Sequence, residues 1–172
     1  WRLVTAAGLA AAMIGGSWLV STGTKSAEAQ ATGSISITAA PNPVSVGQNF
    51  TATITVSPAA EGFTSIGFSL PIPSGATAVS CTPSPSNCNI TGSQIIFGLI
   101  SGTPLTAPQV FTATFTAPGT QGTLDLDVTG NECIGAEQNE ISCPDTPITV
   151  TVNAVTEPTA TFTNTPVTPT QT

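Results

Sequence analysis

The side chains in this sequence that could do acid–base or metal chemistry are almost all carboxylates. The chain has nine Asp and Glu residues against two basic ones and no His, and both basic residues, Arg2 and Lys25, precede Ala31. Without imidazole, His-based catalysis, His-activated Ser or Cys nucleophiles and His-ligated metals are excluded. Without cations, the chain from Ala31 onward cannot neutralise nucleic-acid phosphates or anionic lipid headgroups. The sequence therefore predicts a protein that is not an enzyme and does not bind nucleic acid.

Five carboxylates between positions 127 and 145 are the candidate ligands for a metal ion: Asp127, Glu132, Glu137, Glu140 and Asp145. Ca²⁺ takes about six to eight oxygen ligands in flexible geometry, and a bound cation would relieve the repulsion between like charges in one loop. The spacing lacks the regular pattern of an EF-hand, so an acidic, solvated loop without metal is the alternative interpretation. No other cofactor is predicted.

A second use of carboxylates would be a glycosidase pair. Asp125 and Asp127 are two residues apart on an expected strand, so both would lie on its solvent face. Because any solvated strand face has the same spacing, hydrolysis is kept only as a minor alternative.

Four cysteines fall as two local pairs, Cys81 with Cys88 and Cys133 with Cys143. An even number of cysteines in an exported chain favours disulfides, and four cysteines allow three connectivities. We predict the two local bonds, because each pair brackets a polar segment that short loop closure would rigidify. A zinc site is the rival interpretation, but the sequence offers neither His nor a C-x2-C pair.

The N-terminal segment has the order of a secretory signal. An uncharged, largely apolar run over 3–20 follows Arg2, and small residues suited to cleavage lie at 27–31. The interpretation is a signal peptide over 1–31, with an uncleaved membrane-anchor helix as the alternative, and in that case the membrane is reached only through this segment. The chain begins with Trp1, so we expect residues to precede it. A secreted or cell-surface location is predicted.

Apolar residues alternate with Thr, Ser or Asp along most of 32–154, which predicts strands with one buried face. In 49–57, for example, Phe50, Ala52, Ile54 and Val56 would share the buried face. Turn signals such as Pro41-Asn42-Pro43 separate the strands. The expected strands are 34–38, 49–57, 63–70, 76–80, 94–100, 109–117, 122–128 and 147–154. We therefore predict one all-β domain, a β-sandwich of about eight or nine strands with jelly-roll or immunoglobulin-like topology.

Residues 155–172 have a different composition, dominated by Thr and Pro. Pro stiffens such a segment, Thr solvates it, and too little apolar surface remains to fold. We predict a disordered linker or stalk, and we expect the natural chain to continue beyond it.

Three segments of the expected sandwich resemble cohesin modules. VSVGQNFT (44–51) is similar to the family's V-x-x-G-D-x-(V/F)-T opening, GFTSIGFSL (62–70) to its second strand, and FTATFTA (111–117) followed by LDL (124–126) to a later strand and turn. The chain is therefore identified as a cohesin-like module, from a β-sandwich superfamily that also holds carbohydrate-binding modules. It departs from the family at LPIP (70–73), where cohesins usually have an aromatic residue and an Asp, and in its two cysteine pairs.

The resemblance implies an exported module that binds another protein, as a scaffold or adhesion domain, with a dockerin-like or other surface protein as partner. A strand face rich in hydroxyls is the candidate docking surface, formed by Thr51, Thr53, Thr55, Thr112, Thr114 and Thr116. The alternatives are a carbohydrate-binding module and a purely structural immunoglobulin-like spacer. Polysaccharide is the less favoured ligand, because the domain lacks Trp and Tyr for a sugar platform. The signal, sandwich and Thr/Pro stalk together are typical of surface proteins of filamentous bacteria such as the Chloroflexi.

Overall fold

A computed structural model describes residues 32–83 and 87–155, and all regular structure in these ranges is β-strand. The predicted signal or anchor segment, and all of the predicted stalk except Val155, lie outside the described residues. No helix in the described part is long and apolar enough to cross a membrane. The prediction of an all-β sandwich is confirmed.

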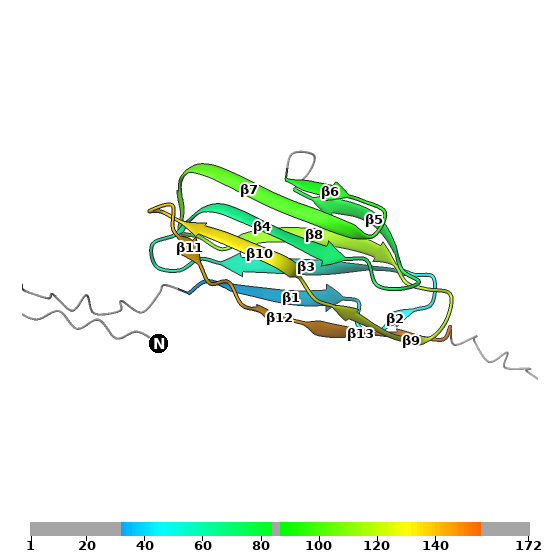
Figure 1. Cartoon of the computed structure of the whole chain (residues 1–172). Coiled ribbons are helices and arrows are strands. Elements are labelled where there is room, and N and C mark those ends of the chain that lie inside the picture. The colour runs from blue at the N-terminus through cyan, green and yellow to red at the C-terminus, as the bar shows by residue number, and fades with distance from the viewer. Residues whose placement is uncertain (1–31, 84–86, 156–172) are drawn as a thin grey trace, which may run out of the picture.

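Two five-stranded sheets pack face to face (Figure 1). The first sheet has, in spatial order, β12 (Asp145–Thr146), β1 (Ser34–Ala40), β3 (Asn49–Ser57), β8 (Gln109–Thr116) and β5 (Thr77–Thr82). The second sheet has β11 (Glu140–Ile141), β10 (Thr129–Gly135), β4 (Phe63–Pro71), β7 (Gln94–Leu105) and β6 (Cys88–Ile90). A smaller sheet of β2 (Val44–Ser45), β13 (Ile148–Asn153) and β9 (Gly122–Leu126) adjoins β1.

The alternation of apolar and hydroxyl residues produces the buried layer, as the pattern predicts. On β3, the four apolar residues from Phe50 to Val56 are at most 1% exposed, while the threonines between them face outward. The predicted inward residues of β4, β8 and β9 are also buried. On β13, Val150 and Val152 are buried, whereas Ile148 is half-buried against the edge of the core.

Phenylalanines join the two sheets in the centre of the core. Phe68 and Phe97 of the second sheet stack with ring centroids 5.0 Å apart, and Phe111 of the first sheet meets both edge-on at 5.2 and 5.5 Å. Edge-to-face and offset contacts of this kind add about 0.5–1.5 kcal/mol each to the burial of the rings. The aromatic cluster therefore fixes how the two sheets sit against each other.

Both predicted disulfides are present, and each closes one open side of the sandwich. Cys81 on β5 bonds Cys88 on β6, so this bond joins the edge strands of the two sheets. Cys133 on β10 bonds Cys143, which lies where the chain crosses from β11 in the second sheet to β12 in the first. The described part of the chain has no free cysteine.

The described residues contain thirteen strands rather than eight or nine. The additional ones are β2, β6, β10, β11 and β12, of which four have only two or three residues. β2 and β12 pair with strands far away in sequence, whereas β6 and β11 pair with the neighbouring strands β7 and β10. All four are too short for local alternation to predict them. β7 also continues to Leu105, five residues past its predicted end.

Candidate interaction faces and acidic cluster

The acidic segment at 130–140 is largely a strand, not the loop that its composition indicates. Residues up to Gly135 belong to β10, which pairs with β4 on one side and β11 on the other. Cys133 and Gly135 are buried, while Glu132, which precedes Cys133, faces solvent and Ile134 between them is half-buried. The alternation is present in the sequence, but the carboxylates conceal it because only Cys and Gly mark the buried side.

Of the five predicted metal ligands, the structure brings Asp127 and Asp145 together. Hydrogen bonding to Asp145, burial, and the negative charge of Asp145 raise the pKa of the Asp127 carboxyl above its ordinary value. Glu132 lies on β10 beside Gly67 of β4, Glu140 pairs with Ile134, and Glu137 is exposed in the turn between β10 and β11. Among the described residues, no group of three Asp, Glu or Cys side chains is arranged to hold a metal ion.

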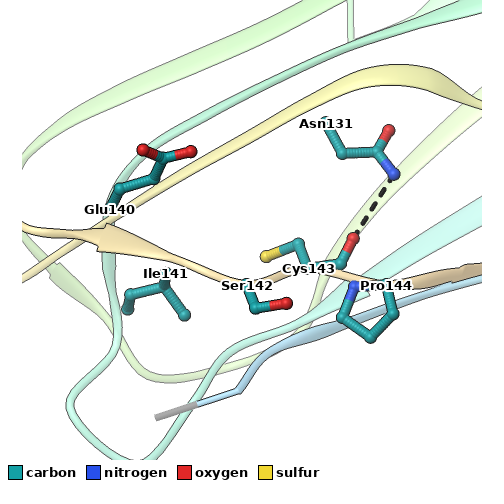
Figure 2. Close-up of a pocket in the computed structure, with 6 residues that line it drawn as sticks. All are labelled: Asn131, Glu140, Ile141, Ser142, Cys143 and Pro144. Atoms are coloured by element: carbon teal, nitrogen blue, oxygen red, sulfur yellow. Dashed lines mark hydrogen bonds between the residues drawn. The ribbon is translucent and has the colours of Figure 1, made fainter. Parts of the chain in front are cut away.

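A shallow pocket of about 480 Å³ lies beside this cluster, between β10 and the segment that leads to β12. Figure 2 shows Asn131 at one end and Glu140 at the other, with Ser142 between them. The Asn131 Nδ2 donates to the Cys143 carbonyl at 3.3 Å and to Asp145 Oδ1 at 3.2 Å. The amide therefore holds the crossing segment against β10.

Asp125 and Asp127, the candidate glycosidase pair, interact with different residues. Thr149 Oγ1 on β13 donates to Asp125 Oδ1 at 3.0 Å, whereas Asp127 interacts with Asp145. Asp125 thus serves the pairing of β9 with β13, which gives this carboxylate a structural use.

The hydroxyl-rich surface predicted as a docking site is the outer face of the first sheet. We call it the threonine face and define it by Thr51, Thr53, Thr55, Thr112, Thr114 and Thr116, all half-buried. Thr51 lies opposite Thr114 and Thr53 opposite Thr112. The Thr51 and Thr114 hydroxyls share a hydrogen bond of 3.4 Å, and Thr116 donates to Asn49 Oδ1 at 2.8 Å. Several of its hydroxyls are thus bonded within the sheet.

The outer face of the second sheet is more apolar, and sequence reasoning missed it. We call it the isoleucine face and define it by Ser65, Gly67 and Ser69 of β4, Ile96, Gly98 and Ile100 of β7, and Ile134 of β10. Ser65 pairs with Ile100 and Ile134, Gly67 with Gly98, and Ser69 with Ile96. Cross-strand partners share a face, and their inward neighbours Ile66, Phe68, Ile95 and Phe97 are buried.

Two large side chains on the isoleucine face are open to solvent. Ile100 is 86% exposed and Ile96 is 40% exposed, and the glycines between them leave a low centre. The signal for this face was present in the run IIFGLI (95–100), which has apolar residues at both alternating sets of positions. A strand with one solvated face would carry polar residues at 96 and 100.

All six phenylalanines in the described residues are at most 3% exposed. Phe63 and Phe97 are both in the core. The described surface therefore contains no aromatic ring on which a sugar could stack.

No family model matches the sequence, and no curated protein matches it. Solved cohesin modules match its structure. A non-cellulosomal cohesin from the archaeon Archaeoglobus fulgidus matches with a TM-score of 0.58 and 15% identity, over 72% of this chain and 92% of that one. The OlpC cohesin of Clostridium thermocellum, solved in complex with the dockerin Doc435, matches with a TM-score of 0.61 and 14% identity, over 75% and 99%.

A third similar structure is the cohesin module of a family 33 glycoside hydrolase from Clostridium perfringens. It matches with a TM-score of 0.59 and 14% identity, over 73% of this chain and 99% of that one. The described residues thus have the cohesin-like β-sandwich fold, as the resemblance of the three sequence segments predicts.

Proposed function

We propose that this chain is an exported, non-enzymatic module that binds a protein partner through its isoleucine face. The observation that carries the proposal is the exposure of Ile100 and Ile96 on the outer face of the second sheet. Single exposed apolar residues are ordinary on protein surfaces, but here two lie on one strand around a low glycine centre. Binding energy in protein interfaces concentrates in such central apolar anchors.

The backbone beneath the face favours close contact with a partner. Gly67 and Gly98 lie opposite each other in the middle of the sheet, and Ser65 and Ser69 flank Gly67 along β4. Small residues let a partner's side chains reach the sheet, while the two isoleucines stand on either side. A flat, partly apolar surface with a shallow centre suits a helix that places its apolar stripe along β7.

Charge favours a neutral or basic partner. The chain has no cation after Lys25, and Glu132 and Glu140 lie on the strands at the β10 side of the isoleucine face. Lys or Arg on the partner would therefore complement this border and speed association. Solved cohesins of the same fold have dockerins bound, which favours a dockerin-like partner over other surface proteins.

Export is supported by the two disulfides that close both sides of the sandwich, because such bonds persist in oxidising compartments. The signal or anchor segment predicted over 1–31 agrees with export to the cell surface or medium. The absence of His from the whole chain and the structural use of Asp125 support a non-enzymatic role. The predicted source is a filamentous bacterium such as the Chloroflexi, in which this chain would be a surface protein.

Capture followed by reconstitution tests the proposal. The whole chain is immobilised and exposed to culture medium from the organism that produces it, captured proteins are identified by mass spectrometry, and the partner is purified. Calorimetry then compares the native chain with an Ile96→Lys, Ile100→Lys variant. We expect the affinity to fall by at least about thirtyfold, the loss typical of a hot-spot residue.

Val110→Lys is the matched control, because Val110 is a 55% exposed apolar residue on β8, beside Thr55 on the opposite face of the sandwich. It introduces one Lys, against two in the test variant, without touching the isoleucine face, so its affinity should stay within about twofold. Equal loss in both variants, or loss only in Val110→Lys, would contradict the proposal. Pelleting with insoluble polysaccharide in place of protein capture would instead favour the carbohydrate-binding alternative.

A further inference from the structure

The threonine face carries its hydroxyl groups in a regular grid on β3 and β8. Thr51 lies directly opposite Thr114 and Thr53 opposite Thr112, and threonines occupy six of the eight positions in four successive outward rows. The other two positions are Asn49 and Val110. Neighbouring strands are about 4.8 Å apart, and alternate residues on one strand are about 6.8 Å apart. These two spacings, at right angles to each other, define the grid.

The grid extends onto the strands on either side. Thr38 of β1 lies opposite Thr53, and Thr82 of β5 lies opposite Thr112. One row across the sheet therefore has a threonine on each of four adjacent strands. The hydroxyl surface is thus centred on Thr53 and Thr112, with threonine neighbours on both sides.

No charged side chain interrupts the grid. β1, β3, β5 and β8 contain no Asp, Glu, Lys or Arg at all. Asp145 of the edge strand β12 pairs with the buried Ile35, so it belongs to the inner side of the sheet. A charged group would have to give up its hydration against a neutral surface, which is costly. The charge-free face therefore complements an uncharged partner.

The hydroxyls of the grid are held in order before anything binds. The Thr82 and Thr112 hydroxyls share a hydrogen bond of 2.6 Å, and Thr116 donates to Asn49 Oδ1 at 2.8 Å. Threonine is branched at Cβ and has few rotamers. Each hydroxyl has one donor and two acceptor sites, so a bond within the sheet leaves capacity toward solvent. Such an array loses little entropy when it meets a rigid surface.

Ordered water is a neutral, rigid surface with matching dimensions. On a prism face of hexagonal ice, oxygen atoms repeat along two perpendicular directions, and each repeat differs from the corresponding grid spacing by about a tenth or less. A threonine hydroxyl can take the place of a lattice water, while its methyl group covers a hollow of the lattice. Crystalline polysaccharide fits less well, because the described surface has no aromatic ring on which sugars could stack.

We propose that the threonine face binds ice, with the grid on β3 and β8 as the contact and Thr53 at its centre. The isoleucine face lies on the other sheet, so this function does not depend on a protein partner there. Adjacent strands rotate by about 20–25° relative to each other, so a flat lattice follows the grid over two strands rather than over the whole sheet. One domain therefore adsorbs weakly, and firm attachment requires many copies together.

Partition between ice and liquid tests the proposal. A solution of the whole chain is frozen slowly from a cold surface until half of it is ice, and the protein in each fraction is measured beside a reference protein that ice excludes. The native chain should be enriched in the ice. Thr53→Lys places a long charged side chain at the centre of the grid, so it should be excluded like the reference. Thr53→Val removes only the hydroxyl and should weaken adsorption about two- to tenfold.

Thr129→Lys is the matched control, because Thr129 is exposed on β10 beside Ser69, on the outer side of the second sheet. It makes the same substitution away from the grid and should partition like the native chain. Thermal unfolding shows which variants fold, and Thr53→Val keeps the test open if Thr53→Lys does not.

Exclusion of the native chain from ice, or equal loss in Thr53→Lys and Thr129→Lys, would overturn the proposal. Sedimentation of the native chain covers the remaining occupant of this face. A dimer that Thr53→Lys dissociates would show that a second copy covers the grid, and this result would also overturn ice binding. A native chain that sediments as a monomer and is enriched in ice is the result expected.

Discussion

The threonine face and the isoleucine face are the outer surfaces of two sheets that share one core, yet their outward side chains have different surroundings. On the threonine face, hydroxyls from neighbouring strands meet and bond to one another, as Thr82 and Thr112 do at 2.6 Å. On the isoleucine face, the side chains of Ile96 and Ile100 have no polar group that could form such a bond, and they stay exposed. A polar face can thus satisfy itself within the fold, whereas an exposed apolar face gains energy only from something that covers it.

The largest effect is expected where the two sheets meet. Phe111 of the first sheet contacts Phe68 and Phe97 of the second and is 1% exposed. Phe111→Ala should lower the free energy of unfolding by about 3–5 kcal/mol, from lost burial and the cavity left behind. Urea unfolding measures this loss. A loss below about 1 kcal/mol would mean that the two faces do not rest on a common core.

Removing each disulfide separately compares the two open sides of the sandwich. Cys81→Ser, Cys88→Ser opens one side and Cys133→Ser, Cys143→Ser opens the other, and the bonds span 7 and 10 positions of sequence. Loop-closure entropy predicts a loss of about 2.5–3 kcal/mol for each pair. Thermal unfolding of the two variants should show similar decreases. A much larger loss at Cys133 and Cys143 would mean that the crossing segment depends on its bond for folding.

Exchanging the chemistry of the two faces tests their contrast directly. Thr112→Val removes the hydroxyl that bonds Thr82 and should cost about 0.5–1 kcal/mol. Ile96→Thr places a hydroxyl on the isoleucine face and should stay within about 0.5 kcal/mol of the native chain. Urea unfolding compares the two. If Ile96→Thr were the more damaging, the isoleucine face would be part of the folded core and not a free surface.

The smallest stability effect concerns Asp127 beside Asp145. Because the pKa of folded Asp127 is raised above its ordinary value of 3.8, the folded chain holds its proton more tightly than the unfolded chain. The resulting stabilisation is complete below that value and is lost as pH rises through the raised pKa. Asp127→Asn should therefore melt above the native chain near pH 7, and this advantage should shrink as pH falls toward about 4.

Differential scanning calorimetry across this pH range measures the difference. Asp145→Asn serves as a control, because it removes the group that raises the pKa of Asp127 and should give a similar pH profile. An unchanged profile in both variants would contradict the coupling of the two carboxylates. The same samples test the calcium hypothesis: two carboxylates supply few of the oxygens that Ca²⁺ needs, so any binding is expected in the millimolar range. Micromolar binding would restore the predicted five-residue site.

Sequence alternation predicted the buried faces of β3, β4, β8 and β9, because there each residue's environment follows from its own strand. It did not predict β2 or β12, since those strands depend on partners far away in sequence, and it did not predict β6, which has too few residues to show an alternation. Pro41-Asn42-Pro43 was interpreted as a turn, and no local pattern shows that its central side chain bonds Thr149 and Thr151.

The same distinction between local and distant interactions applies to the candidate site. The two local disulfides could be predicted because short loops constrain their ends. The acidic residues were close in sequence, yet the strand β10 separates them in space, and only Asp127 and Asp145 meet. The threonine face was found because Thr signals solvent, whereas the isoleucine face was missed because Ile96 and Ile100 suggest burial.

Methyl NMR of the chain with its purified partner tests the central claim most directly. With labelled Ile and Val methyl groups, Ile96 and Ile100 report on the isoleucine face and Val110 reports on the threonine face. We predict that addition of the partner shifts or broadens the Ile96 and Ile100 signals and leaves the Val110 signal unchanged. Shifts at Val110 with unchanged Ile96 and Ile100 would contradict the assignment of the binding face.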